Sequence, residues 1–140
     1  MRISEIMSRD TVIADPNETI EAVARRMADQ DIGYLPVGEQ DRLVGSITDR
    51  DIVTRGLANG RDGSCTVDEI MTRDVKYCFD EDDVEQIAGN MANNGVRRLP
   101  VINRDKRLVG VVSLSDAAQH GAAEGAGRGL GKLGAQPGTA

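Results

Sequence analysis

The chain contains two stretches in which apolar residues recur at intervals of three and four. This spacing is typical of a helix that buries one stripe along its length. Helices are therefore predicted over residues 20–28 and 84–92. Thr19 and Asp83 are plausible N-caps, because their side-chain oxygens can accept a hydrogen bond from a free backbone N–H. The apolar positions are Ile20, Val23, Ala24, Met27 and Ala28 in the first stretch, and Val84, Ile87, Ala88, Met91 and Ala92 in the second.

Short apolar runs bounded by turn residues predict strands around each helix. Pro36 and Pro100 lack a backbone N–H, so they must lie where the ladder needs no donor, such as a sheet edge. In each half the last two strands are separated by a short polar segment and should form a hairpin. Strands are expected over residues 11–14, 34–37 and 43–48 in the first half, and 75–79, 98–102 and 108–113 in the second. Short helical turns are expected at 3–7 and 67–71, and closing helices at 49–59 and 114–120.

The chain repeats itself. IMSRD at residues 6–10 returns as IMTRD at 70–74, an offset of 64 residues. The two predicted helices are separated by the same offset, and so are the LPV motifs at 35–37 and 99–101. After one extra residue in the second copy, RLVGSIT aligns with RLVGVVS. Four blocks in the same order with one insertion indicate an internal duplication. Two copies favour a pseudo-two-fold pair over a solenoid.

Each copy reads β-α-β-β-α after its helical turn, which predicts an α+β fold of two tandem repeats with small sheets packed against helices. The 140 residues suffice for one compact domain or a pair of small modules. The first repeat should span residues 1–58 and the second 66–120, joined by a linker at 59–65. Residues 121–140 are dominated by Gly and Ala and are expected to form a disordered tail.

Composition narrows the possible functions. Apolar residues make up 39% of the chain but aromatic residues only 2%, so the core must be aliphatic. A net charge of −6 and few stacking side chains argue against nucleic-acid binding. No run approaches the roughly 18 apolar residues that a membrane span needs. The N-terminus lacks the apolar segment of a signal peptide, so a cytoplasmic location without membrane partners is expected.

Residues that often carry chemistry are scarce. Cys65, Cys78 and His120 are too isolated for a disulfide framework, a zinc knuckle or a catalytic dyad. Cys78 is interpreted as a buried structural thiol and Cys65 as a loop thiol. We therefore expect no enzyme, no metal site and no required cofactor. A redox or metal-dependent enzyme that uses these three residues is a remote alternative.

The order IM-x-R-D, helix, LPV, RLVG and [ST]-x-x-D, present twice over about residues 1–120, resembles a tandem pair of cystathionine β-synthase (CBS) domains, or Bateman module. The resemblance is to the stand-alone bacterial type. It implies a ligand-sensing module whose cleft between repeats binds an adenosyl compound such as AMP, ADP, ATP or S-adenosylmethionine. Modules of this family often pair into flat dimers, so a homodimer is also implied.

The [ST]-x-x-D motifs are Thr48–Asp51 and Ser113–Asp116, each where a strand should run into a helix. An aspartate there can accept hydrogen bonds from the two ribose hydroxyls, and the Thr or Ser hydroxyl can meet a phosphate. The same pattern is a capping box that needs no ligand. Both interpretations stay open from the motif alone, and the resemblance favours ribose binding in at least one copy.

The resemblance also implies an adenine slot in each copy, lined by the first strand and the strand that carries the proline. Most of these side chains could equally be apolar core. The residues are Thr11, Val12, Ile13, Tyr34, Leu35 and Pro36 in the first copy, and Val75, Lys76, Tyr77, Arg98, Leu99 and Pro100 in the second.

The copies differ in charge. The second has Arg97 and Arg98 ahead of its LPV, and the first has Arg50 inside its TDRD motif. The resemblance implies that such basic residues reach ligand phosphates, whereas a solvated basic patch explains them equally well. The predicted function is a non-catalytic regulatory module that senses an adenosyl ligand and signals to an unknown effector protein. The alternative is a ligand-free dimer that serves as a protein interaction platform.

Overall fold

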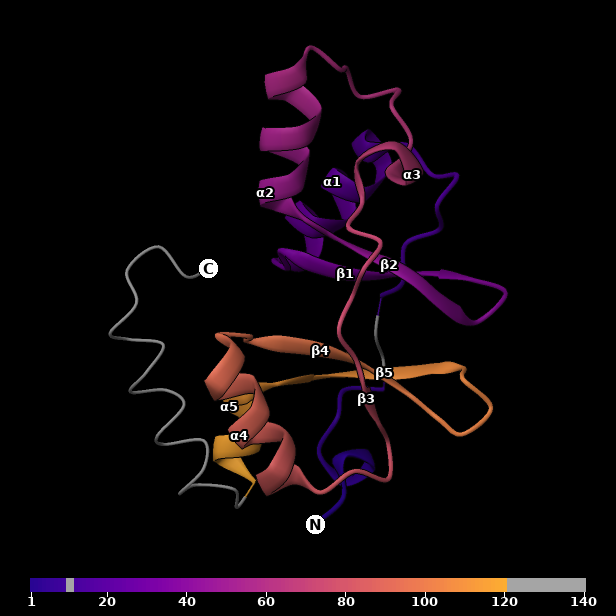
Figure 1. Cartoon of the computed structure of the whole chain (residues 1–140). Coiled ribbons are helices and arrows are strands. Elements are labelled where there is room, and N and C mark those ends of the chain that lie inside the picture. Colours follow the sequence, from indigo (N-terminus) through magenta and orange to yellow (C-terminus); the bar gives the residue numbers. More distant parts are fainter. Residues whose placement is uncertain (10–11, 121–140) are drawn as a thin grey trace. The chain divides into compact units, whose positions relative to one another are not determined.

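The computed structural model describes residues 1–9 and 12–120, which divide into two compact units (Figure 1). Unit 1 combines the first ten residues with the chain from Lys76 onward, and unit 2 is Thr11–Val75. The sequence repeats and the compact units therefore do not coincide. Each unit contains the leading segment of the other repeat, which is the stretch that carries IM-x-R-D. The stretch expected as a linker, 59–65, lies inside unit 2. The tail expected at 121–140 lies outside the described residues.

Unit 2 contains one antiparallel hairpin with the helices that flank it in the first repeat, and the short helix α3 of the second repeat. Strand β1 pairs with β2, and Ala14 adds a single parallel bridge to Val37 on the other side of β1. Helix α2 continues without a break through a π-helical turn, Ile52–Gly56, and a 3-10 turn, Leu57–Asn59. The elements are α1 (Ile20–Gln30), β1 (Tyr34–Glu39), β2 (Arg42–Thr48), α2 (Asp49–Asp51) and α3 (Val67–Ile70).

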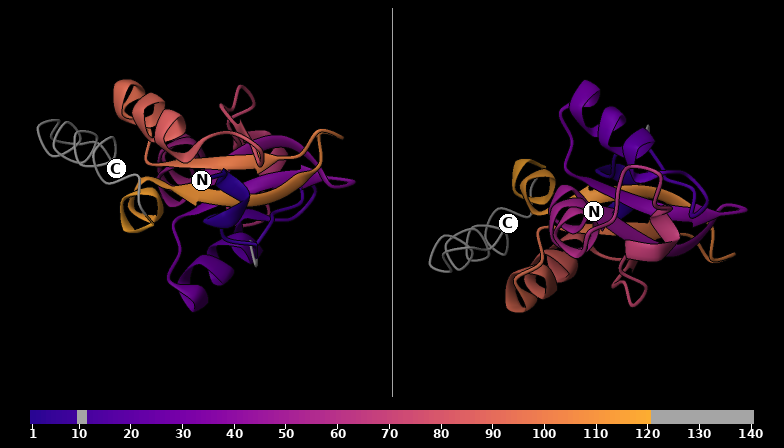
Figure 2. Two further views of the ribbon diagram at one scale, coloured as in Figure 1. Left: turned by 90° about the horizontal axis from the view of Figure 1, so that it is seen from below. Right: turned by 90° about the horizontal axis from the view of Figure 1, so that it is seen from above.

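Unit 1 repeats this plan with one more strand. Its sheet has the order β3-β4-β5, with β3 parallel and β5 antiparallel to β4. Helices α4 and α5 lie at the end of the β4–β5 hairpin away from its turn (Figure 2). The elements are a 3-10 turn (Ile3–Glu5), β3 (Cys78–Phe79), α4 (Val84–Asn94), β4 (Arg98–Ile102), β5 (Leu108–Ser113) and α5 (Leu114–Gln119).

The long helices begin where the apolar spacing and caps place them. Thr19 Oγ1 accepts a hydrogen bond from the Ala22 N–H at 3.2 Å, and Asp83 Oδ2 accepts one from the Gln86 N–H at 3.1 Å. Both predicted N-caps are confirmed. The helices end at equivalent residues, Asp31 and Gly95, which both adopt the left-handed conformation with φ of 52° and 65°.

The strands predicted over 11–14 and 75–79 are largely wrong. The first is reduced to the bridge at Ala14 and the second to Cys78–Phe79. Pro36 provides the reason in unit 2. Its carbonyl accepts a hydrogen bond from the Ala14 N–H at 3.0 Å, but the next ladder bond upstream would need the N–H that proline lacks.

Pro100 has the same effect in unit 1, where β3 begins only at Cys78, opposite Val101. Its partner across the hairpin is Val111, whose N–H and C=O both bond to Ser8, so this pair needs no donor from Pro100. The expectation that the ladder needs no donor at this proline therefore holds on the β5 side, whereas on the β3 side the missing donor ends the pairing. The suggested edge position is wrong for Pro100, because β4 is the central strand.

The leading segments explain the glycine of each RLVG motif. Ser46 and Thr72 exchange two backbone hydrogen bonds of 2.9 Å in unit 2, as Ser8 and Val111 do at 2.8 and 3.1 Å in unit 1. A Cβ on Gly45 would lie 2.7 Å from the Thr72 carbonyl oxygen. A Cβ on Gly110 would lie equally close, 2.7 Å, to the Ser8 carbonyl oxygen. The glycines therefore allow the IM-x-R-D segments to cross the sheets.

Each unit has its own core, and both cores are aliphatic as predicted. The buried clusters contain Ile, Val, Leu, Met, Ala and Cys and no aromatic side chain. Met7 and Met71 from the two IM-x-R-D motifs are buried in the unit that each segment joins. Within the described residues, no helix is long and apolar enough to cross a membrane.

Candidate functional site

Unit 1 contains a groove of about 330 Å³ between helix α4 and the segment that leads into β3. Lys76 and Tyr77 form one wall, and Leu99 of β4 contributes to the apolar lining. Tyr77 is 49% exposed. Asn90 and Asn94 of α4 also line the groove, and Asn94 Nδ2 donates a hydrogen bond of 2.8 Å to the Asn90 carbonyl oxygen. The full lining is Lys76, Tyr77, Ile87, Asn90, Met91, Asn94, Val96 and Leu99.

The chemistry of this groove suits a flat, partly polar ligand. Its apolar residues can bury a ring, while two amides and a lysine offer hydrogen bonds at the rim. Because β3 starts only at Cys78, the backbone of Lys76 and Tyr77 lies outside the ladder of the sheet. The proline that shortens the strand thus leaves peptide groups beside the groove that a ligand can reach.

The Ser113–Asp116 motif forms a complete capping box at the start of α5. Asp116 Oδ2 accepts a hydrogen bond from the Ser113 N–H at 3.2 Å, and Ser113 Oγ accepts one from the Asp116 N–H at 3.0 Å. The Leu114 N–H also donates to the Arg97 carbonyl at 3.0 Å, which ties this helix start to the residues before β4. Asp116 is half-buried, and Arg97 and Arg98 are exposed.

Thr48 and Asp51 form the matching box in unit 2, with hydrogen bonds of 2.9 and 3.1 Å. Here Arg55 places Nε 3.9 Å from Asp51 Oδ1, so a cation already accompanies the second carboxylate oxygen. The equivalent position in unit 1 is His120. Arg50 is exposed on the first turn of α2. Both motifs therefore act as caps, and the cap by itself does not decide between the two interpretations.

The other predicted residues divide between the units. Leu35, Pro36, Leu99 and Pro100 are buried, and the two leucines belong to the two cores. Val75 falls in unit 2 although Lys76 begins the unit 1 segment. Thr11 lies outside the described residues. Val12, Ile13 and Tyr34 are in unit 2, where Val12 packs half-buried against the core and Ile13 is exposed.

Sequence reasoning missed the helix side of the groove. Asn90 and Asn94 lie one turn apart on α4, flanking the buried stripe. Their spacing of four, next to Ile87 and Met91 on the same helix, was the available signal. It could have placed two amides on one side of a helix that faces the adenine slot.

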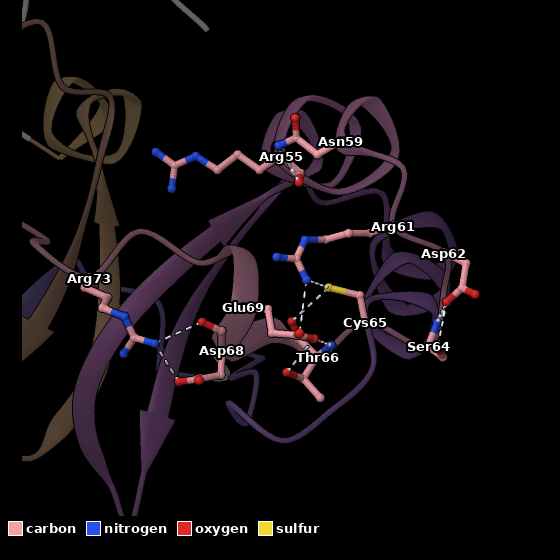
Figure 3. A network of polar contacts seen from close by, with 10 residues as sticks. All are labelled: Arg55, Asn59, Arg61, Asp62, Ser64, Cys65, Thr66, Asp68, Glu69 and Arg73. Carbon is pink, nitrogen blue, oxygen red and sulfur yellow. Dashed lines mark hydrogen bonds and ion pairs between the residues drawn. The ribbon is translucent and has the colours of Figure 1, made fainter.

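Cys65 lies in a polar network of unit 2 that organises the chain before α3 (Figure 3). Arg61 bonds to Glu69 Oε1 at 3.0 Å, and the Thr66 N–H donates to Glu69 Oε2 at 2.8 Å. The backbone hydrogen bond from Thr66, followed by the contact with the Cys65 thiol and more weakly by Arg61, lowers the pKa of Glu69 to about 2. Burial raises the pKa of the Cys65 thiol. The network holds a structural loop, and Cys65 is a buried loop thiol.

Cys78 is buried in the core of unit 1, as predicted, and burial raises the pKa of its thiol to about 12. The described residues contain no group of three or more His, Cys, Asp or Glu side chains arranged to hold a metal ion.

The sequence model of one protein family, described as "CBS domain", matches this chain twice, over residues 3–57 and 67–122. It is 40% identical over 118 residues to hypoxic response protein 1 of Mycobacterium tuberculosis, covering 83% of this chain and 82% of that protein. It is 36% identical over 116 residues to CBS domain-containing protein YhcV of Bacillus subtilis, with 83% and 82% covered.

Solved structures agree. The crystal structure of Hypoxic Response Protein I, which has two coordinated zinc ions, has a TM-score of 0.76, 39% identity and coverage of 86% of this chain and 98% of that one. The CBS domain pair of protein MJ0100, in complex with 5-methylthioadenosine and S-adenosyl-L-methionine, has a TM-score of 0.73 and 29% identity. The two chains are covered to 85% and 98%. Two adenosyl compounds therefore occur with a structure similar to this one.

Proposed function

This chain belongs to the CBS domain family, and we propose that it is a non-catalytic sensor that binds an adenosyl ligand in the groove of unit 1. The observation that carries the proposal is the groove itself, which brings Lys76, Tyr77 and Leu99, three of the predicted slot residues, beside two asparagine amides. A volume of about 330 Å³ lies within the range of small-molecule sites. The ligands of the MJ0100 pair support the adenosyl class.

Unit 1 contains a candidate group for each part of such a ligand. The ring of adenine would lie against the apolar lining and bond to the amides or to the backbone at Lys76 and Tyr77. The ribose hydroxyls would meet the Asp116 carboxylate, whose position the capping box fixes. Arg97 and Arg98 would attract a phosphate or carboxylate on the ligand, because guanidinium groups bind such anions with two parallel hydrogen bonds.

Isothermal titration with AMP, ATP and S-adenosylmethionine tests the proposal, and the two repeats provide a matched control. Asp116→Ala and Asp51→Ala each remove the carboxylate of one capping box, at a cost of about 1 kcal/mol of stability. Only Asp116→Ala should also weaken binding, by about 5- to 150-fold if the lost ribose contact contributes roughly 1–3 kcal/mol. No binding by any of the three compounds, or equal affinity in both variants, contradicts the assignment.

We propose as a second function that the helix face of unit 2 mediates self-association. A groove of about 390 Å³ lies between α1 and α2, lined by Ala24, Met27, Ala28, Asp31, Ile32, Gly33, Asp49, Ile52 and Val53. Val53 and the nearby Leu57 are 57% and 60% exposed, which is unusual for large aliphatic side chains. A second copy of the chain would cover this face, and the dimer would present the sensor to an effector protein.

Sedimentation equilibrium at micromolar concentration tests the dimer. The double substitution Val53→Ser with Leu57→Ser should shift the wild-type dimer toward the monomer. Phe79→Ser, at another exposed apolar side chain in unit 1, should leave the dimer intact. A monomeric wild-type protein would contradict this second function and would leave the ligand proposal standing.

A further inference from the structure

We infer that Arg26 occupies the first repeat's counterpart of the groove, so that each chain binds one adenosyl ligand, in unit 1. The inference rests on the proposed function and deepens it, because it assigns the number of working sites and the residue that sets this number. It is drawn from a contact in unit 2 that the second repeat is unable to form.

The two repeats can be compared residue by residue at the groove, since the offset of 64 is unbroken from the first strand to the LPV motif. Most equivalent positions are similar in character, as with Leu35 and Leu99 or Met27 and Met91. Two pairs differ in charge: Val12 stands where unit 1 has Lys76, and Arg26 stands where unit 1 has Asn90. Only the second difference places a longer side chain in the first repeat. The counterparts of the unit 1 lining are Val12, Ile13, Val23, Arg26, Met27, Gln30, Ile32 and Leu35.

Arg26 reaches from α1 across to the segment before the sheet. Its Nη1 donates a hydrogen bond to the Ile13 carbonyl oxygen at 3.2 Å, and its Nη2 pairs with the Glu18 carboxylate. The Arg26 and Glu18 side chains are only 30% and 33% exposed. Glu18 is itself held by a hydrogen bond of 3.2 Å from the Asp15 N–H. The guanidinium is therefore held by two partners, the Ile13 carbonyl and the Glu18 carboxylate.

This contact joins the two walls that stand apart in unit 1. Ile13 is the counterpart of Tyr77 and Arg26 the counterpart of Asn90. In unit 1 both residues line the groove, Tyr77 from the segment before β3 and Asn90 from α4. An asparagine side chain ends two bonds beyond its Cβ, so Asn90 is too short to span the distance that an arginine spans. The open groove of unit 1 and the bridged walls of unit 2 follow from one difference in side-chain length.

The contact occupies a hydrogen-bond acceptor that a bound ligand would use. A backbone carbonyl beside an apolar slot is an acceptor for the exocyclic amino group of adenine, and in unit 2 a guanidinium N–H already donates to it. A ligand entering there would have to displace Arg26 and separate it from Glu18. Removing one partner from a half-buried ion pair leaves the other poorly solvated, which opposes displacement.

The experiment exchanges the two equivalent residues and counts sites by isothermal titration with S-adenosylmethionine and with AMP. The wild-type chain should bind one equivalent. Arg26→Asn should bind two, because the first repeat then carries the residue of the second. Asn90→Arg should lose the wild-type site or weaken it at least tenfold. Arg25→Asn is the matched control, since this neighbour is exposed and its guanidinium pairs with the Glu21 carboxylate, and it should still bind one equivalent.

A second variant keeps the test valid if Arg26→Asn unfolds. Glu18→Gln leaves Arg26 in place but removes the charge that anchors it, and should expose a weaker second site. Far-UV circular dichroism and the thermal midpoint without ligand verify that each variant is folded.

The outcomes separate the inference from the function on which it rests. Two equivalents bound by the wild type, or one equivalent bound by both Arg26→Asn and Glu18→Gln, would overturn the role of Arg26 and leave the proposed function intact. No binding by the wild type with one equivalent bound by Arg26→Asn would support the role of Arg26 and overturn the unit 1 site. No binding by any variant would overturn both.

Discussion

At the scale of single residues, the two repeats serve as controls for each other. Asp31 and Gly95 end equivalent helices in the same left-handed conformation, with φ of 52° and 65°. Glycine adopts this conformation freely, whereas a residue with a Cβ is strained in it by roughly 1–2 kcal/mol, less for Asp and Asn. The first repeat therefore carries a strain that the second avoids.

Asp31→Gly should accordingly raise the free energy of unfolding by about 1 kcal/mol. Urea denaturation monitored by circular dichroism measures the change. Asp29→Gly, two residues earlier and inside α1, should instead destabilise the protein by up to about 1 kcal/mol, because glycine is unfavourable within a helix. A loss of stability in Asp31→Gly would show that the Asp31 side chain contributes more than its backbone strain costs.

The Cys78 thiol gives a second prediction at this scale. Burial, with smaller effects from Asp82 and Asp80, raises its pKa to about 12 from an ordinary value near 9. A group whose pKa is raised on folding stabilises the folded state below its unfolded pKa, and this contribution falls as the pH rises from 9 toward 12. The free energy of unfolding should therefore decrease above pH 9, and less so in Cys78→Ala.

Alkylation provides an independent measurement, because the thiolate is the reactive form of cysteine. At pH 8, iodoacetamide should modify Cys78 only after the protein is unfolded in urea. Rapid labelling of Cys78 in the folded protein would contradict both the burial and the raised pKa.

At the scale of elements, the crossing of each IM-x-R-D segment depends on a glycine. A Cβ at Gly110 would lie 2.7 Å from the Ser8 carbonyl oxygen and 2.9 Å from the Met7 sulfur. Gly110→Val should therefore destabilise the protein by at least about 1–3 kcal/mol through overpacking. Thermal unfolding measures the loss.

Gly89 provides the contrast, since it lies inside α4 and a Cβ there would meet no atom within 4 Å. Gly89→Ala should stabilise the protein by about 0.4–1 kcal/mol, because alanine is the better helix former. If Gly110→Val were as stable as the wild type, the leading segment would not cross the sheet as described.

The elements also show which parts of the fold a local sequence pattern can predict. The spacing of Val84, Ile87 and Met91 was enough to predict α4, because helical periodicity is a local property of the chain. The strand before α4 was predicted too long because Pro100, more than twenty residues away, removes its ladder partner. That effect depends on pairing between distant segments, which a local pattern does not contain.

At the scale of the whole molecule, the duplication predicted the two repeats but not which segments make up each compact unit. IM-x-R-D looks the same whichever sheet it joins, so only the structure shows that each leading segment belongs to the other repeat's unit. The candidate site shows the same division. Lys76, Tyr77 and Leu99 were predicted from the family resemblance, whereas Asn90 and Arg26 were missed because each was seen only as a polar position on a helix.

The central claim is that an adenosyl ligand enters the groove of unit 1 and not its counterpart in unit 2. The most direct test is a titration of the ¹⁵N-labelled protein with S-adenosylmethionine, followed by two-dimensional NMR. The account predicts shifts in the backbone signals of Lys76 and Tyr77 and in the side-chain amides of Asn90 and Asn94, with Ile13 unchanged. Shifts centred on Ile13, or none at millimolar ligand, would contradict it.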